Sequence, residues 1–169
     1  GIRMNSGCFD KEFKDILISI QLTDFNGIVR SIPAKKINFN YRSIKLPKNL
    51  IFLSATFKGK KKNSLEIDNL MKKLKQKKEL AQPSKIKTGG STFKNPIKQT
   101  DKKVWELIRF SVASDKCFGD AIISNKHANF FVNKKNAKSA DMKSLINFVK
   151  KQVRSKTGVS LELEIVIVE

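Results

Sequence analysis

Hydrophobic and polar positions in the first third of the chain form short runs typical of β-strands. Residues 16–22 and 28–32 are rich in β-branched side chains, and Asp24-Phe25-Asn26-Gly27 separates them. An Asn-Gly pair between two such runs is a strong signal of a β-hairpin. Residues 51–57 form another apolar run. The pattern therefore predicts a hairpin followed by a further strand.

The spacing of apolar residues changes to a helical period after this region. In residues 64–80 they recur every three or four positions among many lysines, with Ser64 as a candidate cap. The same period predicts a helix around residues 104–108 and a clearer one over residues 140–154. We expect Gly158 to end this last helix, because glycine readily adopts the left-handed conformation found there.

The second half of the chain also contains shorter strand-like runs. Residues 121–124 and 130–133 are mostly apolar. Residues 159–167 have apolar side chains at every second position, with Glu162 and Glu164 on the opposite parity. Strands and helices thus follow each other without a regular βαβ order, which predicts an α+β fold. Gln82-Pro83-Ser84 breaks the helical pattern and predicts a domain boundary.

The composition is strongly basic. The formal net charge is +20, carried mostly by lysines spread over the chain. Nucleic acid, an anionic membrane surface or phosphorylated small molecules could each explain the charge, and so could a lysine-rich composition with no role in binding. A nucleic-acid reader more often shows arginine clusters with exposed aromatic residues, so nucleic acid is the less favoured partner.

Cysteine and histidine content limits the kind of site. Cys8 and Cys117 are far apart in sequence and do not make a disulfide framework, which favours a reducing, cytoplasmic compartment. One histidine, His127, together with two distant cysteines does not supply the ligands of a metal site. No apolar run approaches the roughly 20 residues needed to cross a bilayer, so we expect no membrane partner.

The stretch Gly89 to Pro96 combines two glycines with a serine, an aromatic residue, a lysine and an asparagine. This set could form a surface turn, or a site where the backbone comes close to a ligand. Ser91, Arg42 and Glu164 are the candidate chemical groups: a proton donor, a carboxylate binder and a charged relay. Each could equally be an ordinary turn or surface residue, and His127 could be structural or catalytic.

Several motifs, taken together, resemble the UDP-N-acetylenolpyruvoylglucosamine reductase family. The final segment, Gly158 through Ile165, resembles the Gly-x-x-Leu-Glu-x-Glu strand that closes these proteins. The other matching segments, in chain order, are Arg3-Met4-Asn5-Ser6-Gly7, Tyr41-Arg42-Ser43, Gln82-Pro83 with Gly89 to Pro96, and Ser124 to Phe130 with Asn133. The match spans nearly the whole chain.

The resemblance implies a reaction and its catalytic residues. The family reduces UDP-N-acetylglucosamine enolpyruvate to UDP-N-acetylmuramate for peptidoglycan synthesis, with FAD reduced by NADPH. Ser91 would donate the proton to the enolpyruvyl group. Arg42 and Glu164 would orient and polarise the enolpyruvyl carboxylate.

The resemblance also implies binding residues. Lys94 and Asn95 would place the substrate near Ser91, with Tyr41 and Gly90 beside it. Arg3, Met4 and Asn5 would be the cofactor-binding residues and lie along the flavin.

The resemblance finally implies a domain organisation. Residues 1–83 would be the C-terminal half of a flavin-binding domain, to which residues 158–169 return, and residues 84–157 would bind the substrate. The chain starts within the flavin domain, so we expect a truncated protein: a fragment, one half of a split protein or the product of a decaying gene. One half of a split protein would have a separate N-terminal half of the flavin domain as its partner. The alternative function is a non-catalytic basic domain that binds nucleic acid or other polyphosphates.

Overall fold

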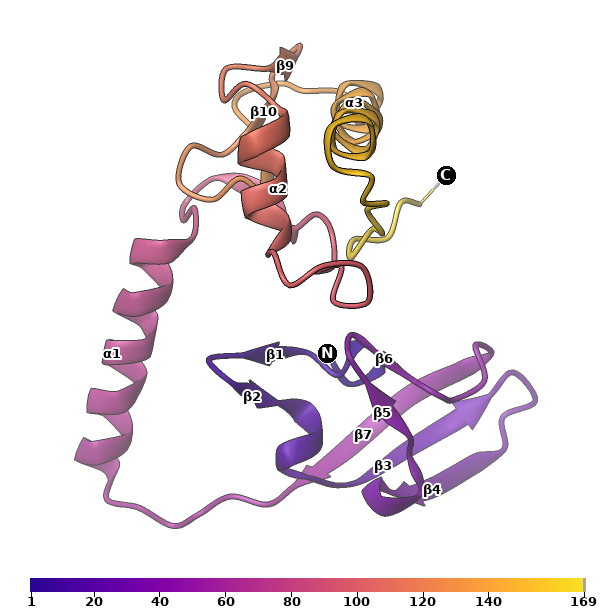
Figure 1. The fold of residues 1–169 in the computed structure, drawn as a ribbon. Coiled ribbons are helices and arrows are strands. Elements are labelled where there is room, and N and C mark those ends of the chain that lie inside the picture. The colour runs from indigo at the N-terminus through magenta and orange to yellow at the C-terminus, as the bar shows by residue number, and fades with distance from the viewer. Residues whose placement is uncertain (169) are drawn as a thin grey trace. The chain divides into compact units, whose positions relative to one another are not determined.

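The computed structural model describes residues 1–168 and divides the chain into two compact units, Gly1–Asn63 and Ser64–Glu169. Helices and sheets are mixed, which confirms the predicted α+β class (Figure 1). Among the helices that the structure describes, none combines the length and the apolar character needed to cross a membrane. Each unit has its own hydrophobic core and is described separately.

The first unit is built on an antiparallel sheet in which β3 (Leu17–Asp24) lies between β4 (Val29–Pro33) and β7 (Leu50–Phe57). The predicted hairpin and the strand after it are confirmed. Asp24 closes the turn, because its Oδ1 atom accepts hydrogen bonds from the backbone N–H groups of Asn26 and Ile28. The buried side chains of this unit are Leu17, Ile20, Leu22, Ile37 and Ile44.

Two short hairpins accompany this sheet. The first pairs β1 (Gly7–Cys8) with β2 (Lys11–Glu12), and the second pairs β5 (Phe39–Asn40) with β6 (Ser43–Ile44). Tyr41 and Arg42 form the turn of the second hairpin. Three turns of 3-10 helix connect these elements: Ile2–Met4, Phe13–Asp15 and Ala34–Lys36.

The second unit contains an antiparallel sheet in the order β8–β11–β10–β9, from β8 (Lys87–Ser91), β9 (Cys117–Phe118), β10 (Ala121–Ile123) and β11 (Phe130–Asn133). Helices α2 (Val104–Ser111) and α3 (Ser139–Thr157) contact each other beside this sheet (Figure 1). Gly158 ends α3 with a φ of 73°, as predicted. Leu145, Ile146, Val149 and Val153 are the buried face of α3 and form much of the core.

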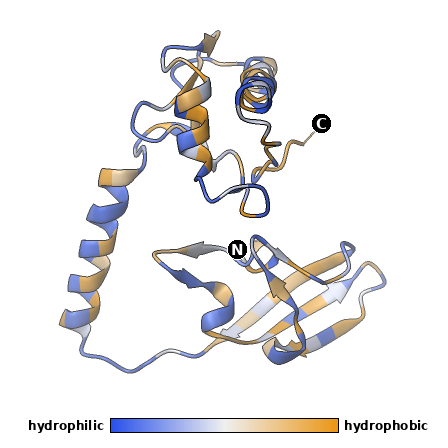
Figure 2. Ribbon diagram, in the orientation of Figure 1, coloured by the Kyte–Doolittle hydropathy of each residue, from blue (hydrophilic) through white to orange (hydrophobic). Residues whose placement is uncertain are grey.

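Helix α1 (Ser64–Ala81) confirms the helix predicted from the lysine-rich periodic segment. None of its residues, all of which the structure describes, is buried. Figure 2 shows hydrophilic positions over much of its surface, interrupted by apolar ones. Its C-terminal end is joined to the rest of the second unit, because Lys126 Nζ donates a hydrogen bond to the backbone oxygen of Glu79.

One predicted local structure was wrong, and one open alternative is decided. The glycine stretch does not begin as a surface turn, because Lys87–Ser91 pairs with β11 as an edge strand. Residues 159–167 do not form a continuous strand; they contain an isolated bridge between Leu163 and Phe93. Their alternation still predicts burial, since Val159 and Leu161 are in the core. A buried face requires packing on one side only, whereas a strand in a sheet also requires a neighbouring strand in the hydrogen-bonding direction.

The two compact units have other bounds than the predicted domains, which stay a prediction. The units are divided between Asn63 and Ser64, and α1 contacts the rest of the second unit through Lys126. Residues 158–168 belong to the second unit as well, because they pack on its core and bond to residues 92–94. Residue 169 lies outside the described residues. The assignment of the parts to flavin and to substrate stays a prediction.

Candidate functional site

The end of β8 and the segment after it carry Ser91 and Lys94 and are held from both sides. Ser91 is half-buried and pairs with Phe130 at the start of β11. The next residue, Thr92, donates its N–H to the backbone oxygen of Asn129 and accepts the N–H of Glu164 at 2.9 Å. The backbone at Ser91 is therefore fixed on one side by the sheet and on the other by the C-terminal segment.

Gly90, directly before Ser91, has a φ of 86°. This left-handed conformation suits glycine, which has no Cβ to clash with the backbone. A Cβ placed on Gly90 would meet nothing within 4 Å, so the backbone conformation, and not lack of space, favours glycine here. Gly90 lies in the stretch between Thr88 and Ser91, where the pairing of β8 with β11 is irregular.

Asn129 is a buried polar residue beside this segment. Its Nδ2 atom donates to the Phe93 carbonyl at 2.8 Å, and its Oδ1 atom accepts the Phe93 N–H at 3.0 Å. Its own N–H donates to Nδ1 of His127 at 3.2 Å. Asn129 is 4% exposed, so these bonds are shielded from water.

Lys94 and Asn95 take part in contacts within the protein. Lys94 Nζ lies 3.7 Å from Glu162 Oε2, and the Glu162 side chain is largely exposed. Val104 is the first residue of α2, and its N–H donates a hydrogen bond to Asn95 Oδ1 at 3.0 Å. This bond satisfies one of the unpaired N–H groups at the start of a helix, so Asn95 has a structural use in addition to any contact with a ligand.

His127 is enclosed by aromatic rings. Its ring centroid lies 4.9 Å from that of Phe130 and 6.5 Å from that of Trp105, and the Arg109 guanidinium stacks over Trp105. Burial, with a smaller contribution from the charge of Arg109, lowers the pKa of His127. A neutral ring with Nδ1 as acceptor suits a structural role next to Asn129.

In the first unit, Arg42 and Tyr41 lie at the tip of the β5–β6 hairpin. Arg42 has a φ of 51°, its Nη2 atom donates to the Gly7 carbonyl at 3.3 Å, and its guanidinium lies over the Tyr41 ring. Arg42 also lines a cavity of about 410 Å³ together with residues of the β1–β2 hairpin. Glu12, Asp10 and Asp15 share that lining, so the cavity mixes both signs of charge.

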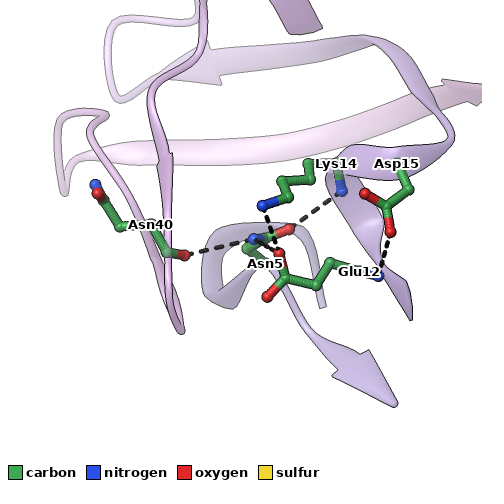
Figure 3. A network of polar contacts seen from close by, with 5 residues as sticks. All are labelled: Asn5, Glu12, Lys14, Asp15 and Asn40. Carbon is green, nitrogen blue, oxygen red and sulfur yellow. Dashed lines mark hydrogen bonds and ion pairs between the residues drawn. The ribbon is translucent and has the colours of Figure 1, made fainter. Parts of the chain in front are cut away.

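Asn5 is completely buried at the centre of a polar network (Figure 3). Its Nδ2 atom donates to Glu12 Oε2 at 3.0 Å and to the Asn40 carbonyl at 3.4 Å, and its Oδ1 atom accepts the Lys14 N–H at 3.1 Å. The pKa of Glu12 is lowered mainly by the hydrogen bond from the side chain of Lys14, and also by the bond from Asn5. Burial opposes both and raises the pKa.

Arg3 is also engaged within the first unit. Its guanidinium donates to the carbonyls of Pro47 and Leu50 at 3.2 Å and lies over the Phe52 ring. Arg3 and Asn5 therefore use their polar groups to join segments of this unit. Met4 lies between them and is half-buried.

The family model for the UDP-N-acetylenolpyruvoylglucosamine reductase C-terminal domain matches residues 82–168. The chain belongs to the UDP-N-acetylenolpyruvoylglucosamine reductase family. The predicted family membership is confirmed, and the alternative of a separate class of basic binding domain is not supported.

Individual members of this reductase family resemble the chain along its whole length. The UDP-N-acetylenolpyruvoylglucosamine reductase of Pelagibacter ubique (strain HTCC1062) is 63% identical over 169 residues, which cover 100% of this chain and 56% of that protein. The reductase of Rickettsia bellii (strain RML369-C) is 41% identical, with 98% of this chain and 54% of that protein covered. The chain thus spans about half the length of these relatives.

A solved structure of the reductase family has the same fold. The crystal structure of UDP-N-acetylenolpyruvylglucosamine reductase from Thermus caldophilus matches with a TM-score of 0.78 at 28% identity. The match covers 96% of this chain and 57% of that one. Both units described above therefore have counterparts in a known member of the family.

The structure distributes the predicted site residues of this reductase-family chain over its two units. Those of the second unit are Gly90, Ser91, Lys94, Asn95 and Glu164, and those of the first are Arg3, Met4, Asn5, Tyr41 and Arg42. In the second unit the backbone bond between Thr92 and Glu164 brings the segments of Ser91 and Glu164 together. In the first unit the bond from Arg42 to Gly7 joins two hairpins, of which the first follows the Arg3–Asn5 segment.

Sequence reasoning missed Asn129 and Glu12 as residues that organise the site. Asn129 lies within the motif from Ser124 to Phe130, but the sequence alone gives it no role in the site. A polar residue between Ala128 and Phe130, both buried, is the signal that could have identified it, because a buried amide requires partners. No local pattern reveals Glu12, since its link to Asn5 depends on the fold of the β1–β2 hairpin.

Proposed function

We propose that this chain is the part of a UDP-N-acetylenolpyruvoylglucosamine reductase that holds and protonates the enolpyruvyl substrate, UDP-N-acetylglucosamine enolpyruvate. The proposal rests on family membership and on one observation above all. The segment from Ser91 to Lys94 carries a hydroxyl and an ammonium group, and backbone hydrogen bonds hold it on both sides. Gly90, directly before it, has a positive φ. Rigid placement of a proton donor is what general acid catalysis requires.

The roles proposed for the chain's own residues follow from their chemistry. Ser91 Oγ holds the proton that passes to the enolpyruvyl carbon. Arg42, whose guanidinium is fixed by Gly7 and Tyr41, binds the substrate carboxylate, and Tyr41 keeps its orientation. Glu164 polarises the enolpyruvyl group. Lys94 and Asn95 contact the remainder of the substrate, next to the close backbone approach at Gly90.

The whole protein, on this proposal, is a cytoplasmic flavoprotein of peptidoglycan synthesis in which FAD and NADPH carry the electrons. The proposed flavin ligands fit only in part. The side chains of Arg3 and Asn5 are committed to bonds inside the first unit, so they shape the Arg3–Asn5 segment instead of binding the cofactor directly. No step of the proposal is routed through them.

The test uses a chimera in which this chain replaces its counterpart in the Pelagibacter ubique relative. Flavin absorbance then separates two half-reactions: reduction by NADPH and reoxidation by UDP-N-acetylglucosamine enolpyruvate. We expect Ser91→Ala to slow reoxidation by roughly 100-fold or more, while reduction by NADPH is unchanged. Ser91→Cys keeps a proton donor and should retain more activity, and Ser84→Ala, at an exposed serine, serves as the control.

Two outcomes would refute the proposal. A flavin-loaded chimera that NADPH reduces but that the enolpyruvyl nucleotide does not reoxidise would exclude the reaction. Equal losses in both half-reactions with Ser91→Ala would exclude the role of Ser91 as proton donor.

A further inference from the structure

The main chain from Thr92 to Lys94 forms some of its hydrogen bonds with a side chain instead of with another main chain. Strand β11 begins at Phe130, so the regular ladder between β11 and β8 ends at the pair of Phe130 and Ser91. Asn129 continues the pairing instead. Its carbonyl accepts the Thr92 N–H at 2.8 Å, and its side-chain amide both donates to and accepts from the main chain of Phe93.

The opposite edge of the same segment is held by the C-terminal residues. Glu164 donates its N–H to the Thr92 carbonyl, and Lys94 donates its N–H to the Glu162 carbonyl, both at 2.9 Å. The segment therefore lies between a side-chain amide and an extended backbone. The C-terminal residues alone do not fix Phe93, because its N–H and carbonyl both bond to Asn129.

We propose that Asn129 is a positioning residue of the reductase reaction, acting through the main chain of Phe93 to hold Ser91 and Lys94 in place. This inference rests on the function proposed above. Asn129 touches no reacting group, since its amide is buried and committed to Phe93. An amide suits the position because it carries a donor and an acceptor side by side, as a backbone peptide does.

The chain contains a matched control for this arrangement. Asn133 binds the main chain of Ala137 in the same two-bond manner: Oδ1 accepts the Ala137 N–H at 3.0 Å and Nδ2 donates to the Ala137 carbonyl at 3.3 Å. Asn133→Ala therefore removes the same kind of contact from the loop before α3. A difference between Asn129 and Asn133 variants reports on the Ser91 segment and not on the loss of an asparagine clamp in general.

The first experiment needs no flavin or substrate. Amide hydrogen exchange of this chain, followed by NMR, should show Phe93 exchanging at least about tenfold faster in Asn129→Ala, with the α3 core amides unchanged. Asn133→Ala should leave Phe93 unchanged. Asn129→Asp adds a test in case the alanine variant does not fold, because a protonated carboxyl can again donate to the Phe93 carbonyl. Protection of Phe93 should then recover as the pH falls.

The second experiment uses the chimera. Asn129→Ala should slow reoxidation of the flavin by the enolpyruvyl nucleotide by roughly 10- to 100-fold, with reduction by NADPH unchanged, while Asn133→Ala leaves both rates unchanged. Unchanged protection of Phe93, or equal effects of the two variants on reoxidation, would overturn the positioning role. If the unmodified chimera does not use the nucleotide, the proposed function fails, and the exchange experiment still decides whether Asn129 fixes the segment.

Discussion

Asn5 and Glu12 are joined by a hydrogen bond of 3.0 Å, from Nδ2 to Oε2, that ties the first turn of the chain to the β1–β2 hairpin (Figure 3). The same amide binds the Asn40 carbonyl in β5, directly before the Tyr41–Arg42 turn. Asn5 itself has a φ of 38°, a conformation that asparagine tolerates better than most residues. One buried side chain thus connects the segments around the Arg42 cavity.

The first prediction concerns Asn5→Ala. The substitution leaves the Lys14 N–H and the Asn40 carbonyl without their side-chain partner, so we expect the free energy of unfolding of the first unit to fall by about 1–3 kcal/mol. Hydrogen exchange of the β3 amides measures this loss. Asn40→Ala is the control, because Asn40 contributes its backbone carbonyl to this network and its side chain is exposed. Equal losses in the two variants would contradict the role of the Asn5 amide.

The second prediction concerns Glu12 and acid. The pKa of Glu12 is lowered in the folded state from 4.5, mainly by the hydrogen bond from Lys14. A carboxyl with a depressed folded pKa stabilises the fold above its unfolded pKa, and this stability is lost as the pH falls through the folded pKa. The first unit should therefore lose stability below about pH 4.5. Glu12→Gln should flatten this dependence, and Asp10→Asn, at an exposed position of the same hairpin, should leave it in place.

Much of the fold could be predicted from the sequence because its signals are local. The Asn26-Gly27 turn and the helical period of residues 140–154 each lie within one element, and the structure contains both elements. The prediction of a strand over residues 159–167 was wrong, because alternation indicates which side chains are buried. It does not indicate how far a pairing partner extends. Here the partner is Thr92 to Lys94, which is too short for a full strand.

The candidate site was less predictable for a physical reason. Ser91 and Lys94 were identified through a family motif, but what fixes them is Asn129, 36 residues from Phe93 in the chain. The side-chain amide of Asn5 bonds to partners up to 35 residues away, which the family motif around Asn5 does not indicate. Partners of buried polar groups depend on tertiary structure, and no periodicity in the sequence records them.

The third prediction concerns Gly7, whose carbonyl receives the Arg42 guanidinium. A Cβ at this position would lie 2.6 Å from the Lys11 carbonyl, which is main chain and moves only if the β1–β2 pairing changes. Gly7→Ala should therefore destabilise the first unit by about 1–3 kcal/mol. Gly59→Ala, where a Cβ meets nothing within 4 Å, is the control. Exchange of β3 amides that is equally slow in both variants would contradict the predicted clash.

The fourth prediction concerns His127. Burial first, and the charge of Arg109 next, lower its pKa below the ordinary 6.5. The unfolded chain then takes up the proton at higher pH than the folded chain, so the second unit should lose stability as the pH falls below about 6.5. His127→Gln should remove this part of the pH dependence. Urea unfolding followed by Trp105 fluorescence between pH 5 and 8 would show it, and an unchanged slope in the variant would refute it.

The last prediction separates two roles of Asn95. Its Oδ1 atom accepts the Val104 N–H at the start of α2, so Asn95→Ala should lower the stability of the second unit by about 1 kcal/mol, as loss of a helix cap does. Asn95→Asp keeps the acceptor and places a negative charge at a helix N-terminus, where it is favourable, so stability should be retained. The proposed contact with substrate depends on the amide, and the aspartate should therefore raise the KM for the nucleotide in the chimera without unfolding the unit. An aspartate variant with unchanged stability and unchanged KM would leave Asn95 with the structural role alone.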